Sequence, residues 1–185
     1  MKPTVFLGHV GEDHELAASL ATAVEKGLES ADVAVSVFNT SDDRHRFPEL
    51  DLADASGSPD LQRVIDYGAA LKEYLVSTLS GSVAYLLLVT RRSITRNSGW
   101  IAFEAERAAQ CETPIIPCLA DGLCWEDVVH TSYEEREHTE IQRSRWMPSL
   151  NRPWRMARER IMVDITSEEG VKRLVSGLKQ LLRNE

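Results

Sequence analysis

The stretch VAYLLLV, residues 83 to 89, decides the fold. Every residue in it is apolar or aromatic, with no polar side chain at alternate positions. A strand with one face in water alternates apolar and polar residues, whereas a strand covered on both faces is apolar throughout. The stretch therefore predicts a central strand of a parallel sheet with helices on both sides.

Four further short runs rich in β-branched and aliphatic residues fit the same sheet, and they lie at residues 4–7, 33–38, 114–119 and 161–165. Helix-like segments separate them, and such alternation is the mark of an α/β fold. We expect a flavodoxin-like five-stranded parallel sheet, order 2-1-3-4-5, with helices on both faces. At 185 residues the chain is expected to form one domain.

Two helices carry clear signals. The first, from about Asp13 to Leu28, has Asp13 placed as its N-cap and one apolar face made by Leu16, Leu20, Val24 and Leu28. The last covers about 167–183, with Thr166 and Glu169 spaced as a capping box. Between them, Gly68 is expected to split the helical segment that starts near Pro59.

Composition limits the class of protein. The net charge of -8 and the pI near 5.2 argue against nucleic-acid binding, which needs clustered Lys and Arg. No signal-like leader and no membrane-length apolar run is present in the sequence, so a cytoplasmic protein is expected. Three cysteines, 111, 118 and 124, match no zinc spacing and are expected to be free and mostly buried. No metal site is predicted.

Two segments lack regular periodicity. Residues 39–60 are rich in Pro, Gly and short polar side chains and are predicted to form a long loop. Residues 120–160 form an irregular charged insertion, acidic in its first half and Arg-rich over 143–160. Such charge runs are usually solvated surface, and that is the plain interpretation of this insertion.

Ligands of open parallel sheets bind beyond the carboxyl ends of the strands, where the strand order reverses. Here that crevice lies between the first and third strands, and it is lined by residues 8–13 (GHVGED) and 90–99 (TRRSITRNSG). The second loop runs into Trp100 and Glu104, which are one helical turn apart and share a face. Gly8 would let backbone N–H groups approach a ligand, and His9 is expected in a structural or substrate-contact role. The plain alternative for Glu104 is a solvated surface side chain.

These residues resemble a TIR (Toll/interleukin-1 receptor) domain of the bacterial NAD-cleaving type. TVFLGHVGEDHELAASLATAVEKGL is similar to the opening strand, loop and helix of that family, and SGSVAYLLLVT with SGWIAFEAERA is similar to its third strand and serine-x-tryptophan-xxx-glutamate signature. The resemblance covers about residues 4–120. It departs from the family in the first loop, where Gly8, Val10 and Gly11 replace the usual serines.

The resemblance implies NAD⁺ as substrate with no cofactor, and Glu104 as the catalytic carboxylate that stabilises an oxocarbenium-like ribose. It implies Ser98 and Trp100 beside the substrate. The 39–60 loop has no clear motif of the family, so Arg44 and Arg46 are only candidate phosphate or base contacts. Such a chain would act as an NAD⁺ glycohydrolase or ADP-ribosyl cyclase in bacterial antiphage signalling, assembled through TIR–TIR contacts and linked to a separate sensor or effector.

Two alternatives stay open at this stage. One is a non-catalytic TIR interaction module that assembles through the 39–60 loop and the Arg-rich 143–160 segment. The other is a nucleoside-processing enzyme such as a deoxyribosyltransferase, which shares the parallel sheet and also uses a glutamate. The first predicts indifference to loss of Glu104, and the second predicts exchange of bases on free nucleosides.

Overall fold

The computed structural model describes residues 2–40, 42, 45, 61–95, 99–124 and 162–183. The strands are β1 (Thr4–Gly8), β2 (Ser36–Asn39), β3 (Ser82–Val89), β4 (Ile115–Leu119) and β5 (Val163–Asp164). The helices are η1 (Gly11–Asp13), α1 (His14–Glu29), α2 (Leu61–Ser80), α3 (Arg91–Thr95), α4 (Gly99–Gln110) and α7 (Glu168–Arg183). None of these helices is long and apolar enough to cross a membrane.

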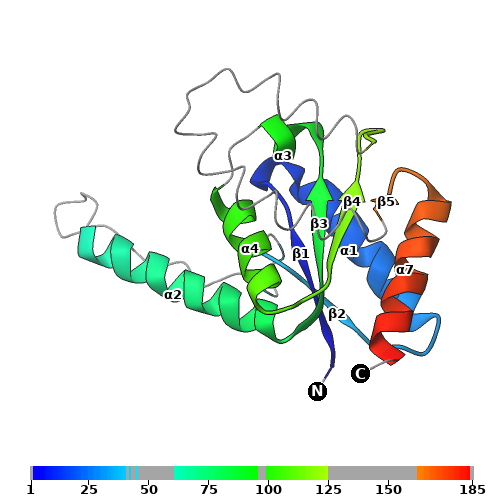
Figure 1. Ribbon diagram of the computed structural model, residues 1–185, viewed down its shortest axis with the longest axis horizontal. Helices are drawn as coiled ribbons and strands as arrows, with labels where there is room; N and C mark the ends of the chain where they lie inside the picture. Colours follow the sequence, from blue (N-terminus) through cyan, green and yellow to red (C-terminus); the bar gives the residue numbers. More distant parts are fainter. Residues whose placement is uncertain are drawn as a thin grey trace.

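The five strands form one parallel sheet in the order β2-β1-β3-β4-β5, which confirms the predicted fold class and strand order (Figure 1). Strand β5 is short, pairing only with Cys118 and Leu119 of β4. The preceding residue of β4 is Pro117, which has no amide hydrogen to donate to a neighbouring strand. Strand β5 is shorter than the predicted 161–165, of which residue 161 lies outside the described residues.

Strand β3 explains the two layers of helices. All of its residues are buried, and successive side chains point to opposite faces of the sheet. Leu86 and Leu88 join the apolar cluster beneath α1 and α7, whereas Tyr85 and Leu87 join the cluster beneath α2 and α4. Figure 1 shows these two pairs of helices on opposite sides of the sheet. Both faces of the central strand are thus excluded from water, as the sequence predicts.

The predicted helix α1 forms, but two details of it are wrong. Leu20, Val24 and Leu28 are buried as expected, whereas Leu16 is 36% exposed because it lies in the first turn, at the edge of the face that meets the sheet. Asp13 makes no side-chain capping hydrogen bond to the helix. Its carboxylate instead accepts a hydrogen bond from the hydroxyl of Thr90, beyond the end of β3.

Two further helix predictions need correction. The cap of α7 is Ser167, whose Oγ accepts a hydrogen bond from the Gly170 amide at 3.0 Å, while Thr166 bonds to Asp164. Helix α2 continues through Gly68 without a break. A glycine costs a helix only about 1 kcal/mol relative to alanine, and the buried Leu75 and Leu79 anchor α2 on the sheet.

None of the three cysteines forms a disulfide, but only Cys118 is buried; Cys111 and Cys124 are exposed, so the expectation of mostly buried thiols is wrong. Burial raises the pKa of the Cys118 thiol to about 12. Most of the predicted loop at 39–60 and of the insertion at 120–160 lies outside the described residues.

Helices α1 and α4 end in the same way, with one residue in the left-handed region. At the end of α4, Thr113 N–H bonds to Ala108 O and Glu112 N–H bonds to Ala109 O, while Glu112 has φ of 58°. At the end of α1, Val33 N–H bonds to Leu28 O across Asp32, whose φ is 59°. These are Schellman motifs, whose left-handed position favours glycine. Val33 belongs to this turn, which is why β2 starts later than predicted.

Replacing Glu112 with glycine is expected to stabilise the protein by about 0.5 to 1 kcal/mol, because glycine adopts the left-handed conformation without the steric cost of a β-carbon. Chemical denaturation of the wild type and Glu112→Gly measures the difference. Glu112→Ala is the control, since it removes the same carboxylate but keeps the β-carbon. Equal stabilisation by alanine and glycine would attribute the gain to charge and contradict the backbone explanation.

Candidate functional site

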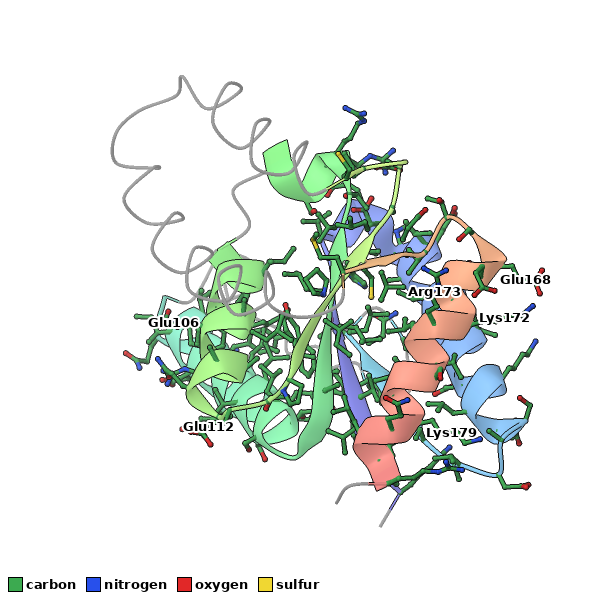
Figure 2. All side chains as sticks on the ribbon, turned by 45° about the vertical axis from the view of Figure 1, so that its right-hand side comes forward. Glu106, Glu112, Glu168, Lys172, Arg173 and Lys179 are labelled. Carbon is green, nitrogen blue, oxygen red and sulfur yellow. The ribbon has the colours of Figure 1, made fainter. Side chains whose placement is uncertain are left out.

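Glu104 is a buried carboxylic acid on α4, with 6% of its surface exposed. It lies among the residues by which α4 packs on the sheet, Ile101, Ala105 and Ala108, all of which are buried. The other acids of this region behave differently, since Glu106 and Glu112 lie on the outer side of the layer (Figure 2). The interpretation of Glu104 as a solvated surface residue is therefore wrong.

The partner of Glu104 is Tyr85 of β3. The Tyr85 hydroxyl donates a hydrogen bond of 3.2 Å to Oε2 of Glu104. The tyrosine ring is fully buried and packs against Phe6 of β1, with ring centroids 5.7 Å apart. A buried tyrosine hydroxyl needs a hydrogen-bond partner, and here the carboxylate of α4 supplies it.

Gly8, the last residue of β1, completes the site. A β-carbon at this position would overlap the Tyr85 hydroxyl and lie 2.6 Å from Oε2 of Glu104. The close approach of three elements thus requires glycine here. Contact between the Gly8 backbone and a ligand stays a prediction. The space that a side chain would take at Gly8 is filled by Tyr85 and Glu104.

Burial controls the electrostatics of this group. Removal from water disfavours the ionised carboxyl and raises the pKa of Glu104 from 4.5 to about 8, against the opposing effect of the Tyr85 hydrogen bond. Burial also raises the pKa of Tyr85 well above 10, and the neighbouring Glu104 raises it further. The pair therefore contains one titrating group near neutral pH and one permanent hydrogen-bond donor.

The other predicted site residues in the described part of the chain make different contacts. Trp100 is 43% exposed and packs edge-on against Phe103, with ring centroids 6.0 Å apart. It therefore differs from Glu104 in burial, although one helical turn separates them. His9 is half-buried, and its Nε2 lies 2.8 Å from Oδ1 of Asn39. Ser98, Arg44 and Arg46 lie outside the described residues.

The predicted crevice between β1 and β3 is bridged by hydrogen bonds. The Thr90 hydroxyl, directly after β3, donates to Oδ2 of buried Asp13 at 2.5 Å. Arg92 Nη1 lies 3.4 Å from Oδ1 of the same aspartate and donates to the backbone oxygen of Glu12 at 3.2 Å. The loops that follow the two strands are thus tied to each other.

Sequence reasoning missed Tyr85 and the Asp13–Thr90 link. The sequence does carry a signal for the tyrosine. It is the one residue of VAYLLLV with a polar atom in its side chain, and a buried hydroxyl needs a hydrogen-bond partner. No comparable signal pairs Asp13 with Thr90, which are 77 positions apart. Their pairing follows only from the adjacency of β1 and β3.

The described residues contain no cluster of three His, Cys, Asp or Glu side chains able to hold a metal ion. What the site offers is a single carboxyl of fixed position that titrates near neutrality. Such a group can act as a general acid or base, or can stabilise a developing positive charge once ionised.

Replacing Glu104 with glutamine is expected to stabilise the protein increasingly as pH rises. The folded chain keeps a proton to about pH 8 that the unfolded chain loses near 4.5, so the contribution of Glu104 to stability falls between these values and is constant above them. Glutamine mimics the protonated form and does not titrate, so the gain should reach at most roughly 5 kcal/mol. Urea denaturation across this pH range measures it.

The matched control for that experiment is Glu106→Gln, an exposed position on the same helix. Its difference from the wild type should show no comparable dependence on pH. If the stability difference between wild type and Glu104→Gln were constant from acidic to alkaline pH, the pKa of Glu104 would be the same in the folded and unfolded chains, which contradicts the expectation.

Replacing Gly8 with alanine should destabilise the protein by about 1 to 3 kcal/mol, because the added methyl group overlaps the Tyr85–Glu104 pair. Gly11 is the control, since a β-carbon there meets nothing within 4 Å. Thermal denaturation should separate the two variants. Equal stabilities of Gly8→Ala and Gly11→Ala would contradict the close packing described here.

Comparison of the chain with protein-family models and with curated proteins finds no match. A functional interpretation therefore depends on the arrangement of Gly8, Tyr85 and Glu104, together with the motif resemblance of residues 4–120.

Proposed function

We propose that this protein is an NAD⁺ glycohydrolase or ADP-ribosyl cyclase of TIR type, with Glu104 as the catalytic carboxylate. The observation that carries the proposal is the burial of Glu104 beside the carboxyl end of β1, with a pKa near neutrality. Strongly perturbed carboxyl groups at the carboxyl edge of a parallel sheet are candidates for catalysis. The serine-x-tryptophan-xxx-glutamate resemblance adds the substrate class.

In the proposed reaction, the bond between C1′ of the ribose and the nicotinamide nitrogen breaks. The bonding electron pair goes to the nicotinamide ring, which leaves neutral, and the ribose carbon becomes cation-like. Ionised Glu104 stabilises this cation. Water then adds to C1′ and loses a proton to give ADP-ribose, or a nitrogen of the adenine base adds to give a cyclic product.

Under this proposal, the ionisation of Glu104 depends on whether substrate is bound. At neutral pH a carboxyl with a pKa of about 8 is mostly protonated. The nicotinamide ring of NAD⁺ is positively charged, and a nearby positive charge favours the ionised carboxyl. Substrate binding would therefore generate the reactive carboxylate, and resting enzyme would hold the neutral acid.

The exposed aromatic ring of Trp100 fits two candidate functions. It lies one turn before Glu104 and offers a flat apolar surface for a nucleotide base or ribose. It also favours the second candidate function, a TIR interaction module, because exposed tryptophans are enriched at protein interfaces. In the catalytic proposal, TIR–TIR assembly, a cytoplasmic location and a role in bacterial antiphage signalling accompany the enzyme activity.

The test is incubation of concentrated protein with NAD⁺, following nicotinamide, ADP-ribose and its cyclic isomers by chromatography and mass spectrometry. Wild type should release nicotinamide, and Glu104→Gln should lower the rate at least 100-fold, because glutamine cannot carry the negative charge. The kcat/KM of the wild type should rise as pH increases through the pKa of Glu104, because kcat/KM depends on the protonation state of the free enzyme.

Glu106→Gln is the matched control and should retain activity, since this exposed glutamate lies on the same helix. Equal nicotinamide release by wild type and Glu104→Gln would remove Glu104 from catalysis. Absence of release by the wild type, both dilute and crowded into assemblies, would favour the interaction module. Exchange of bases on free nucleosides would identify a deoxyribosyltransferase instead.

A further inference from the structure

The Tyr85 hydroxyl occupies a position that strand and helix fix from several sides. Tyr85 is fully buried in the middle of β3, where its register partners are Phe6 of β1 and Ile115 of β4. The Phe6 ring packs against it, and the backbone of Gly8 leaves no room for a β-carbon beside its hydroxyl. The hydroxyl therefore cannot leave Glu104 without repacking the core.

The carboxyl of Glu104 ends a flexible side chain, and an unbonded carboxyl could adopt several rotamers. The 3.2 Å hydrogen bond from Tyr85 joins one of its oxygens, Oε2, to the sheet. A hydroxyl that donates to an ionised carboxylate forms a charge-assisted bond, which is stronger than the bond to the neutral acid. The same contact thus selects both an orientation and a charge state.

We propose that Tyr85 is a positioning residue for Glu104, holding its carboxyl toward Gly8 and favouring its ionised form. As a contribution to catalysis this role rests on the proposed function of Glu104. As a contribution to the orientation and proton affinity of Glu104 it stands on the hydrogen bond and the packing alone.

Among the described residues, titratable side chains on the neighbouring elements have other partners. From α2, the Tyr74 hydroxyl donates to the backbone oxygen of His45. Beyond β1, His9 shares a hydrogen bond with Asn39. On α4 itself, Arg107 is exposed and lies over the Phe103 ring, 5.5 Å from its centroid. After burial, the Tyr85 hydrogen bond is the main influence on the pKa of Glu104, and it lowers that pKa.

The experiment compares wild type and Tyr85→Phe, which removes one oxygen and keeps the ring. The Glu104 carboxyl is followed by carbon-13 NMR of the full chain labelled at glutamate, with Glu104→Gln assigning the signal. The apparent pKa of Glu104 should rise by about 1 in Tyr85→Phe, lowering the ionised fraction near neutral pH almost tenfold. The pH profile of NAD⁺ cleavage should move to higher pH by the same amount.

Tyr74→Phe is the matched control, because it removes another partly buried tyrosine hydroxyl, on α2. It should leave both the titration and the pH profile of Glu104 unchanged. A purely structural role for Tyr85 would lower the rate equally at all pH values and leave the titration in place, which would overturn the proposal.

The outcomes separate this inference from the proposed function. A shifted Glu104 titration without NAD⁺ cleavage by the wild type would support the positioning of Glu104 by Tyr85 and reject the proposed activity. NAD⁺ cleavage with an unchanged titration and pH profile in Tyr85→Phe would support the activity and reject the positioning role.

Discussion

The double burial of β3 constrains everything around it. A central strand with helices against both faces has no solvent to satisfy polar side chains, so each of its polar atoms needs a partner inside the protein. On β3 this constraint applies to the hydroxyl of Tyr85, which is fully buried. Its hydroxyl reaches across the layer to α4 and meets Glu104, and the two groups together exclude a side chain at Gly8. The site thus follows from the packing of the sheet.

Burial between the sheet and α4 holds Tyr85 and Glu104 together, but it also disfavours the ionised form of Glu104. Burying a carboxyl is costly unless it is protonated or well bonded, and Glu104 has one hydrogen bond from the described residues and little contact with water. A chain selected for stability alone would place an apolar or amide side chain at this position. Under the proposed function, the acid at this position trades stability for chemistry, a trade that is common at functional sites.

The sequence predicts the layers better than the contacts. The central position of β3 and the apolar faces of α1 and α7 follow from apolar periodicity, which packing enforces over many residues. The strand order is the one expected of a flavodoxin-like fold. The predicted helix caps do not form, because Asp13 bonds to Thr90 beyond the end of β3 and Thr166 bonds to Asp164, two residues earlier. The burial of Glu104 and its contact with Tyr85 depend on how α4 lies on the sheet, and one-dimensional spacing does not contain that information.

Helix α2 shows how unequally one continuous element can be held. Its last two turns, through Leu75 and Leu79, are buried against the sheet, whereas Val64 and Ile65 near its start are 40% and 63% exposed. Figure 1 shows that this first part extends away from the body of the fold. Backbone amides of a helix exchange with solvent through local opening, and opening is easiest where few side chains pack. A gradient of amide protection along α2, low at Leu61 and high at Ser80, is the dynamic counterpart of this one-ended anchoring.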